Sequence, residues 1–491
     1  MRGLNLAAVI LASGLLAGCV VGPNYHRPLV QAPPTYKTEG PWRVAAPKDA
    51  LPKEAWWEIF NDVELNGYEQ QLLKANQSLE AARNRLNQAR ALARVTSAGF
   101  FPTFGADPSV SRNRYSGNRP ELTTPSGPLT QNSYQIPFLL NYEPDLFGSV
   151  RRNLQASNAA LQSTAADLYN ARLVLTAELA ADYFTLRELD AEMRVVQESV
   201  EIQQRGLQLV QSRHTGGVAS GLDLAQQQTL LDSTVTQLYL VQQQRAQYEH
   251  AIAVLTGEPA SSFSLPAREL TTAAPAVPAG VPSELLQRRP DIAAAERTMS
   301  AANALIDVQT TAFYPSFSIG GTSGFQSNNI GSWLTWPSRF FSIGPSASFT
   351  IFDAGARRAV LANYKAQYEA DEAAYRQTVL TAIQQTEDSL AAQHYLTDQL
   401  TQQQVAIDAA QKYLKLANLR FRTGIDSYLN VYTAQTSLLT QQETYINLRV
   451  NQMTSNVQLV EALGGGWDVN QLPSEKDVAR NTNQNVKVDQ P

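Results

Sequence analysis

The sequence has few of the residues on which metal proteins and most enzymes depend. Its 491 residues include one cysteine, so neither a disulfide framework nor a thiolate metal cluster can form within the chain. The four histidines show no metal-ligand spacing, and no phosphate-binding glycine loop or G-x-S-x-G string occurs. We therefore expect no metal site, no cofactor and no enzymatic activity.

The chain also has no large excess of charge of either sign. The net charge is -5 and only 17% of the residues are charged. The chain therefore lacks the basic surface that a nucleic-acid partner requires. The hydrophobic content of 43% is low for a helical membrane protein, and the charged content is low for a soluble coiled coil. No simple class of protein fits this composition.

An apolar stretch near the amino end, residues 4–16, is too short to span a hydrocarbon layer of about 30 Å. Small residues follow it, so residues 1–18 are predicted to be a signal peptide. The lone cysteine comes next, in the string LAGC, which resembles a bacterial lipobox; the alternative is a chance cysteine. We expect Cys19 to carry a covalent lipid, and Val20 after it favours the outer membrane by resemblance to other lipoproteins.

Long amphipathic helices dominate the rest of the chain. After a proline-rich arm, four stretches contain almost no glycine or proline and carry apolar residues at intervals of three and four. The longest would extend for about 100 Å. These stretches are residues 62–98, 149–213, 218–256 and 356–422.

The chain is a duplication. The segment that ends at Phe104 aligns with the one that ends at Phe317, an offset of 213 residues, and RHTGGVAS from Arg213 aligns with RFRTGIDS from Arg420, an offset of 207. Each copy is predicted to contain a short helix, a strand pair, a very long helix, a turn and another short helix. The two short helices of a copy would stack end to end along the long one.

Between the short and the long helix of each copy, the hydrophobic pattern changes to a period of two. Apolar residues alternate with small polar ones over residues 341–351, and more weakly over residues 134–142. This pattern is typical of an outer-membrane β-barrel, and a sheet in a soluble domain is the alternative. The signal peptide, the lipobox and the duplication favour the barrel, with hairpins at residues 100–147 and 313–352.

Four strands in one chain cannot close such a barrel, because bacterial barrels start at about eight strands. Backbone groups in hydrocarbon must all be hydrogen-bonded, so identical chains have to share the barrel with closed symmetry. The small polar face indicates a water-filled interior, which eight strands scarcely permit. A trimer or a tetramer remains.

Six strings along nearly the whole chain resemble TolC-like outer-membrane efflux proteins, specifically the lipoprotein branch that serves resistance-nodulation-division pumps. The resemblance implies a mixed α and β membrane protein, a homotrimer whose long α-helical coiled-coil barrel in the periplasm is continuous with a 12-stranded transmembrane β-barrel. It also implies docking to a periplasmic adaptor protein and an inner-membrane efflux pump. The strings are CVVGPNY, LPKEAWWEIFND, RRPDIAAAER, FYPSFSIGGTSG, FTIFDAGARR and FRTGIDSYLNVYTAQTSLL.

The same resemblance divides the chain into repeats and an equatorial domain. The first repeat is assigned to residues 62–257 and the second to residues 291–463. The equatorial parts would be the arm of residues 19–61, the linker of residues 258–290 and the C-terminal segment of residues 464–491.

Two functions follow from these features. One is a passive duct that exports small molecules and is energised by its pump; the other is a lipoprotein scaffold that spans the periplasm. The hairpins favour the duct, because a scaffold needs no membrane-spanning strands. An enzyme ranks third, since Asp145 and Asp353 lack an evident base or nucleophile partner and are interpreted as turn or interface residues.

Candidate membrane-interface residues are Trp333 and Trp336, between the strands of the second hairpin, where amphipathic rings would suit contact with outer-membrane lipids. Packing within a surface loop is the alternative.

The reversals at the far end of the long helices are predicted at Gly216, Gly217 and Gly424, with Ser220 and Ser427 as caps of the following helices. The resemblance makes these turns the adaptor-docking surface and the pore constriction, although they could be helix caps only. The docking candidates are Gly217, Val218, Ser220, Leu222, Gly424, Ile425, Ser427 and Leu429. Relatives carry aspartates on the helix after the second turn where this chain has Asn430 and Thr433, so the candidate gate acids are Asp223 and Asp426.

Overall fold

The fold is taken from a computed structural model that describes residues 21–22, 24–29, 33, 35–37, 55–116, 129–270, 274–277 and 282–474. The predicted signal peptide, Cys19 and residues 475–491 lie outside the described residues.

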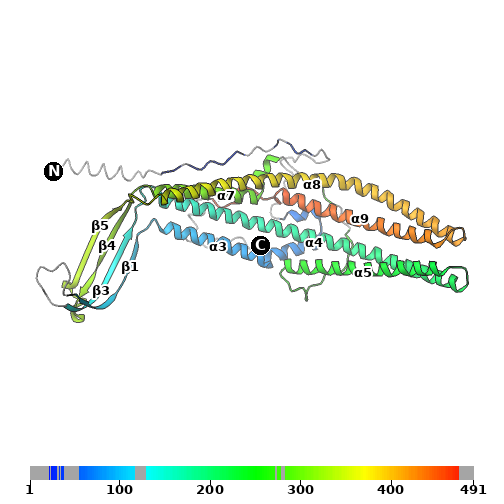
Figure 1. The fold of residues 1–491 in the computed structure, drawn as a ribbon, viewed down its shortest axis with the longest axis horizontal. Helices are drawn as coiled ribbons and strands as arrows, with labels where there is room; N and C mark the ends of the chain where they lie inside the picture. The colour runs from blue at the N-terminus through cyan, green and yellow to red at the C-terminus, as the bar shows by residue number, and fades with distance from the viewer. Residues whose placement is uncertain are drawn as a thin grey trace.

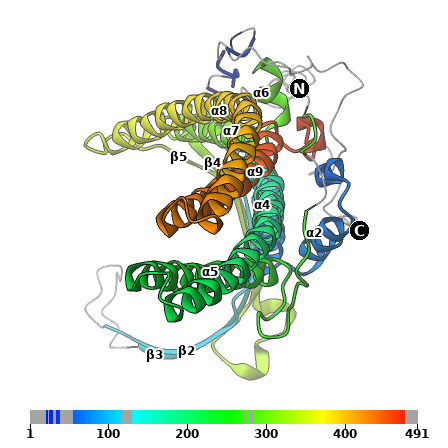
Figure 2. The ribbon, with the colours of Figure 1, turned by 90° about the vertical axis from the view of Figure 1, so that its right-hand side faces the viewer.

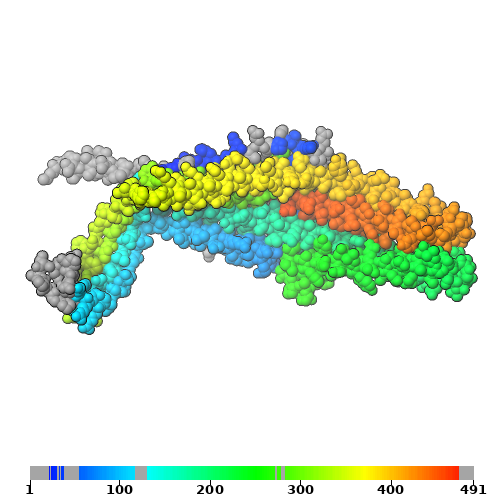
Figure 3. All heavy atoms as spheres, in the orientation of Figure 1, coloured from blue at the N-terminus to red at the C-terminus, as the bar shows by residue number. Residues whose placement is uncertain are grey.

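The described chain forms a long, bent body with a sheet at one end and two helical turns at the other (Figures 1 and 3). Two helices of 67 residues, α4 and α8, run its length. At about 1.5 Å per residue, each extends for about 100 Å. None of the described helices is both long and apolar enough to cross a bilayer. The principal helices are α3 (Gln77–Ala98), α4 (Ser149–Thr215), α5 (Gly221–Leu255), α7 (Pro290–Thr311), α8 (Ala356–Arg422) and α9 (Tyr428–Ala462).

These helices form one curved layer (Figure 2). In the half near the sheet, α4 packs between α3 and α7, and α8 packs on α7. In the half near the turns, α4 packs between α5 and α9, and α8 packs on α9. One edge of the layer is therefore α3 and α5, and the other is α8.

The short helices of the first repeat meet end to end, but the predicted helix of residues 62–98 is broken. It divides into α2 (Val63–Ala75) and α3 at Asn76, which has an extended backbone. The Asn76 side chain accepts a hydrogen bond from the Leu79 amide and donates one to the Leu255 carbonyl, both at 2.9 Å. The C-terminal end of α5 therefore contacts the break between α2 and α3. Gly257, with φ +77°, lies so near that an added Cβ would be 2.5 Å from the Ala75 carbonyl oxygen.

The second repeat has the same joint. Arg289 separates α6 (Leu285–Arg288) from α7, and its guanidinium donates to the Ala462 carbonyl at 2.9 Å. Gly464, with φ +89°, passes the Arg288 carbonyl so closely that an added Cβ would lie 1.9 Å from it. Asn76 and Arg289 are related by the offset of 213 residues, so two different side chains make the same connection.

The sheet is antiparallel, in the order β1-β3-β4-β5, and β2 also pairs with β3. Both β1 and β2 pair with β3 in one continuous register, as Ala106 with Phe138 and Ser109 with Gln135. The ladder is interrupted between them, where Pro108 and Pro137 have no amide hydrogen to donate. The two segments act as one strand, so the sheet has four strand positions. The bounds are β1 Thr103–Ala106, β2 Ser109–Tyr115, β3 Leu129–Tyr142, β4 Ser316–Ser327 and β5 Arg339–Ser348.

The register gives the sheet one apolar and one polar face. Side chains of residues paired across antiparallel strands share a face. The apolar face carries Phe104, Val110, Ile136, Phe138, Leu140, Phe317, Ile319, Phe325, Phe341 and Ile343. The opposite face carries mainly small polar residues and glycine, among them Ser109, Ser111, Ser133, Ser316, Ser318, Thr322, Ser342, Gly344 and Ser346.

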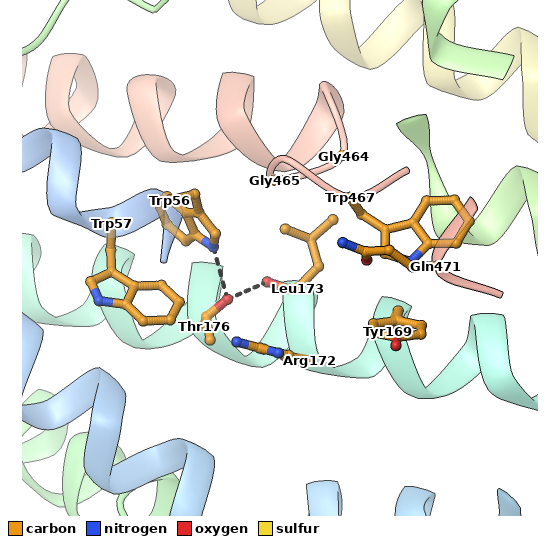
Figure 4. Close-up of a pocket in the computed structure, with 10 residues that line it drawn as sticks. All are labelled: Trp56, Trp57, Tyr169, Arg172, Leu173, Thr176, Gly464, Gly465, Trp467 and Gln471. Carbon is orange, nitrogen blue, oxygen red and sulfur yellow. Dashed lines mark hydrogen bonds between the residues drawn. The ribbon is translucent and has the colours of Figure 1, made fainter. Parts of the chain in front are cut away.

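The main core lies at the waist, where η1 (Trp56–Phe60) packs against α4. The indole of Trp56 donates to the Thr176 hydroxyl at 3.1 Å, and the Phe60 and Phe184 rings lie 4.8 Å apart. Beside them is a cavity of about 30 Å³, lined by aromatic side chains including Trp467 (Figure 4). That volume suits one or two water molecules and no larger ligand.

A buried ionic network fastens the following segment to the same core. The fully buried guanidinium of Arg187 pairs with Glu64 at 2.8 Å and Asp190 at 3.0 Å. Asp190 also pairs with Arg245 at 2.7 Å and accepts from the Arg268 amide at 3.0 Å. Buried charges are tolerated where such partners satisfy them, so this network fixes the chain after α5 against α4.

Candidate functional site

The two turns at the far end of the long helices have the same backbone. Gly217 and Gly424 have φ values of +74° and +73°, which only glycine adopts readily. The amide of Val218 donates a hydrogen bond to the Arg213 carbonyl at 2.8 Å, and the amide of Ile425 donates one to the Arg420 carbonyl at 3.0 Å. This is the Schellman closure of a helix C-terminus. Gly216 has a negative φ of -78° and is the C-cap of α4, so it does not make the reversal itself.

Only one of the two predicted serine caps forms. Ser220 and Asp223 make a reciprocal capping box at the start of α5, with the Asp223 amide 3.1 Å from the serine hydroxyl. Ser427 occupies the N-cap of α9, but its side chain makes no capping hydrogen bond, so the prediction is wrong there. The third helical residue is Asn430 rather than an acid, so the acidic partner of a capping box is missing here.

Each turn exposes a matching pair of apolar side chains. Val218 is 76% exposed and Leu222 67%, while Ile425 and Leu429 are 64% and 49% exposed. The pairs are related by the offset of 207 residues. Exposed apolar groups on a rigid turn are suited to contact with another protein.

The candidate gate residues have different hydrogen-bond partners within the chain. The carboxylate of Asp223 accepts from the Ser220 amide at 3.0 Å and its hydroxyl at 2.8 Å. The carboxylate of Asp426 pairs with the Arg420 guanidinium at 2.5 Å and 3.1 Å, which lowers the pKa of Asp426 below its usual value. Thr433 is exposed, and its hydroxyl donates to the Leu429 carbonyl of its own helix at 2.9 Å.

The sequence interpretation missed a buried tie between the two helical hairpins. The Tyr428 hydroxyl donates to the Gln227 side-chain oxygen, and the Gln227 amide donates to the Gln203 carbonyl at 2.8 Å. The Arg213 guanidinium stacks over the Phe421 ring at 4.6 Å from its centroid. Gln227 aligns with Ala434 in the second repeat, which has no side chain that could accept the equivalent hydrogen bond.

The loop between β4 and β5 contains the two tryptophans. Trp333 is half-buried, and its ring lies 5.5 Å from the ring of Tyr134 on the apolar face of β3. Trp336 is 71% exposed, with the Arg339 guanidinium stacked 3.7 Å from its ring.

The described part of the N-terminal arm follows α7 and α8 toward the waist. The Val21 amide approaches the Phe147 carbonyl at 3.5 Å, at the junction between sheet and helices. Further along, the Tyr25 hydroxyl donates to Glu296 at 2.7 Å, and the Lys37 amide donates to Glu387 at 2.7 Å.

At the sheet end of the arm, a buried ion pair joins Arg152 and Asp307 at 3.1 Å. Gly22 packs directly against the carboxylate, where an added Cβ would lie 2.0 Å from its oxygen. Burial raises the pKa of Asp307 to about 6. The arm is therefore held at the sheet end by a contact that excludes any side chain.

Asp145 and Asp353 lie between a strand and the long helix that follows it, and each accepts hydrogen bonds from backbone amides there. The Asp145 carboxylate accepts from the Val150 and Arg151 amides, each at 3.0 Å, at the start of α4. The Asp353 carboxylate accepts from the Gly355 amide at 3.0 Å and pairs with Arg357, whose hydrogen bond lowers the pKa of Asp353. Within the described residues, no group of three or more histidine, cysteine or acidic side chains is placed to hold a metal ion.

Comparison with known proteins defines the class. The profile described as outer membrane efflux protein matches residues 69–258 and 281–465, which is more than half of the chain. The chain therefore belongs to the outer membrane efflux protein family. It is an outer-membrane channel of an efflux system, and not an enzyme.

Individual relatives extend along nearly the whole chain. The probable efflux pump outer membrane protein TtgC of Pseudomonas putida is 33% identical over 476 residues, which cover 94% of this chain and 96% of the relative. The pyoverdine export outer membrane protein OpmQ of Pseudomonas aeruginosa is 30% identical over 474 residues, which cover 95% of this chain and 97% of the relative.

Solved structures have the same architecture. The outer-membrane channel OprN is similar with a TM-score of 0.84 and 29% identity, over 91% of this chain and all of that one. The open state of the Neisseria gonorrhoeae MtrE channel gives a TM-score of 0.78 and 25% identity, over 91% and 98% of the two chains. Channels of this family work with an adaptor and an inner-membrane pump in tripartite systems.

Proposed function

We propose that the protein is a passive homotrimeric duct, with a 12-stranded β-barrel in the outer membrane and a helical tunnel in the periplasm, docked to an adaptor and a resistance-nodulation-division pump. The observation that carries this proposal is the two-faced sheet at one end of the long helical layer. An apolar face suits lipid, and a face of serine, threonine and glycine suits a water-filled pore.

The edges of the sheet argue for assembly. Within the described residues, β5 has no partner on one edge, and β1 and β2 have none on the other. Unpaired backbone groups are very unfavourable in hydrocarbon, so β5 of one chain would pair with β1 and β2 of the next. Three chains would close the barrel and leave room for water, whereas two would give the eight strands that nearly fill a barrel.

The helical layer has corresponding edges. Exposed apolar side chains lie on α3 and α5 at one edge and on α8 at the other, and an interface between chains would bury them. Those on α3 and α5 include Leu92, Val95, Tyr239 and Val254, and those on α8 include Leu380, Val405 and Leu419.

We propose that the mature amino terminus is lipidated Cys19, anchored in the periplasmic leaflet of the outer membrane. The arm supports this, because Val21, two residues from Cys19, lies at the junction between sheet and helices. Mass analysis of the mature amino terminus would test it, and an unmodified cysteine would remove the lipid anchor from the proposal.

At the periplasmic tip, we propose that the exposed pairs Val218 with Leu222 and Ile425 with Leu429 are the core of the adaptor-docking surface. The constriction of the pore would lie beside them. In a trimer each Asp223 carboxylate would be one of three related by symmetry.

Asp223→Asn should reduce cation selectivity in single-channel recordings more than Thr433→Val does, because only the first change removes charge. An asparagine still accepts the Ser220 hydrogen bonds, so the turn is retained. Equal, negligible effects of both changes would place the constriction elsewhere.

The cargo is proposed to be small organic molecules that the pump selects. Related proteins are named for efflux of toluene and export of pyoverdine, compounds of very different polarity. A pore face of small polar side chains discriminates little between them.

The decisive experiment is conductance. Purified full-length protein should behave as a trimer in detergent by light scattering, and it should form ion-conducting pores in planar bilayers. Trimers that insert but pass no current, even with adaptor present, would favour a periplasmic scaffold over a duct.

A further inference from the structure

We propose that Arg112, Arg114 and Arg339 form a binding site for the phosphate groups of an anionic outer-leaflet lipid, at the outer rim of the sheet. This inference rests on the proposed membrane insertion of the sheet and goes beyond it by naming a lipid class and its ligands. The same phosphate chemistry occurs in free phosphate, but the position on the lipid-facing side of the sheet favours a lipid headgroup.

The strand register places all three arginines on the apolar face. Arg112 and Arg114 follow Val110 at steps of two along β2, and Arg112 pairs with Asn132, two residues from Tyr134 on the same face of β3. Arg339, at the start of β5, pairs with Phe325 on that face. Arg112 and Arg114 lie in the last part of β2 and Arg339 is the first residue of β5. These strand ends lie at the end of the sheet that is away from the helices.

Their height on the sheet is consistent with a membrane boundary. From Phe104 to Val110 the apolar face extends for about 20 Å along the strand, at about 3.3 Å per residue. Tyr134 pairs with Val110 at the end of this stretch, and the Trp333 ring lies beside it. Arg112 and Arg114 lie beyond Val110 on the same face, and Arg339 is level with Ile136, one step before Tyr134. A lipid-facing arginine is unfavourable by about 2–4 kcal/mol at mid-membrane and by only about 0–1 kcal/mol near the interface, which is where phosphates lie.

The guanidinium groups are available to a ligand. None of the three makes an ion pair or a hydrogen bond with a described residue. Arg339 stacks on the exposed Trp336 ring at 3.7 Å, which orients its planar fork and leaves its N–H groups free. Guanidinium binds phosphate through two parallel hydrogen bonds, a geometry that an ammonium group does not offer.

Assembly would bring the arginines together. Arg112 and Arg114 lie on the strand at one edge of the sheet, and Arg339 lies on the strand at the other. When β5 of one chain pairs with β2 of the next, each seam gains arginines from both chains. A bisphosphorylated glycolipid, with two phosphates on one headgroup, would therefore be preferred over a lipid with one phosphate.

The test uses full-length trimers in nanodiscs of phosphatidylcholine with one part in ten of bisphosphorylated lipid A, and native mass spectrometry counts the bound lipid A. The variant is Arg112→Gln with Arg114→Gln. The control, Arg85→Gln with Arg205→Gln, removes the same charge from exposed positions on α3 and α4.

We expect the variant to lose about 25-fold in preference for lipid A over phosphatidylcholine, because each basic residue at an anionic surface contributes about fivefold. Arg339→Gln should reduce it about fivefold, while the control should match the unchanged protein. Lysine at positions 112 and 114 should restore only part of the preference.

Equal lipid A binding by variant and control, with normal trimers and conductance, would overturn the site and leave the duct intact. Failure of the unchanged protein to enter nanodiscs would count against the proposed duct instead. Inorganic phosphate at millimolar concentration that displaces lipid A completely would show a free-phosphate site and overturn the lipid assignment.

Discussion

At the scale of single residues, the two turns at the far end of the long helices share a backbone conformation and differ in the side chains that connect them. Gly217 and Gly424 provide the same reversal, so the turn geometry does not distinguish the repeats. The connection between hairpins comes from one repeat reaching the other, through Tyr428 to Gln227 and Arg213 to Phe421. A buried hydrogen bond at the tip is therefore the natural restraint on separation of the hairpins.

Tyr428→Phe should weaken that restraint. It removes the hydroxyl and leaves the Gln227 oxygen buried without a donor, a loss of about 1–3 kcal/mol. The open fraction of the tip should rise about tenfold, seen as longer high-conductance events in planar bilayers. Tyr432→Phe is the control, since Tyr432 packs against the same cluster. An identical rise in both variants would mean that the effect does not come from the hydrogen bond between Tyr428 and Gln227.

At the scale of elements, helix periodicity predicted the long helices to within a few residues. The 67-residue helices begin at Ser149 and Ala356, the first residues of the predicted stretches, and end at or within two residues of the predicted bounds. The break at Asn76 was missed, because asparagine is tolerated within helices and its partner, the Leu255 carbonyl, is far away in sequence. The Tyr428 tie was missed for the same reason. Local pattern identifies helices, whereas long-range polar contacts depend on packing.

Asn76→Ala should lower the free energy of unfolding by about 2 kcal/mol, since it removes both the cap of α3 and the bond to α5. Asn76→Ser is the matched variant. It keeps an acceptor for the Leu79 amide and loses only the donor to Leu255, so a loss of about 1 kcal/mol is expected. Unfolding in denaturant, followed by helical circular dichroism, would measure both losses. An equal loss would assign the whole effect to the bond with Leu255, which both substitutions remove.

At the scale of the whole molecule, the proposed duct requires the sheet to be the end that enters the membrane. Its apolar face continues across all strand positions, while the helices expose scattered apolar groups that suit neighbouring chains. The two faces of β5 offer a direct comparison, because Ser342 and Ile343 are adjacent in sequence and point to opposite sides.

Ile343→Lys should impair insertion, because a lysine on the lipid face is unfavourable by about 2–4 kcal/mol near mid-membrane and a trimer carries three. Ser342→Lys places the same charge on the pore face and should insert normally while lowering cation conductance. Flotation with lipid vesicles and single-channel recording would separate the two variants. Normal insertion of the Ile343 variant would contradict the assignment of that face to lipid.

The two joints between short helices also determine the order in which the two repeats can fold. The bond from Asn76 to Leu255 spans 179 residues, and the bond from Arg289 to Ala462 spans 173. A secreted chain emerges from its amino end, so each repeat closes only when its last helix has been delivered, and the second waits for nearly the whole polypeptide. Over that interval the apolar strands have neither lipid nor a neighbouring chain beside them. The consequence is a long interval between export and assembly in which an unassembled chain is open to aggregation, so a chaperone that covers the strands would raise the yield of assembled protein.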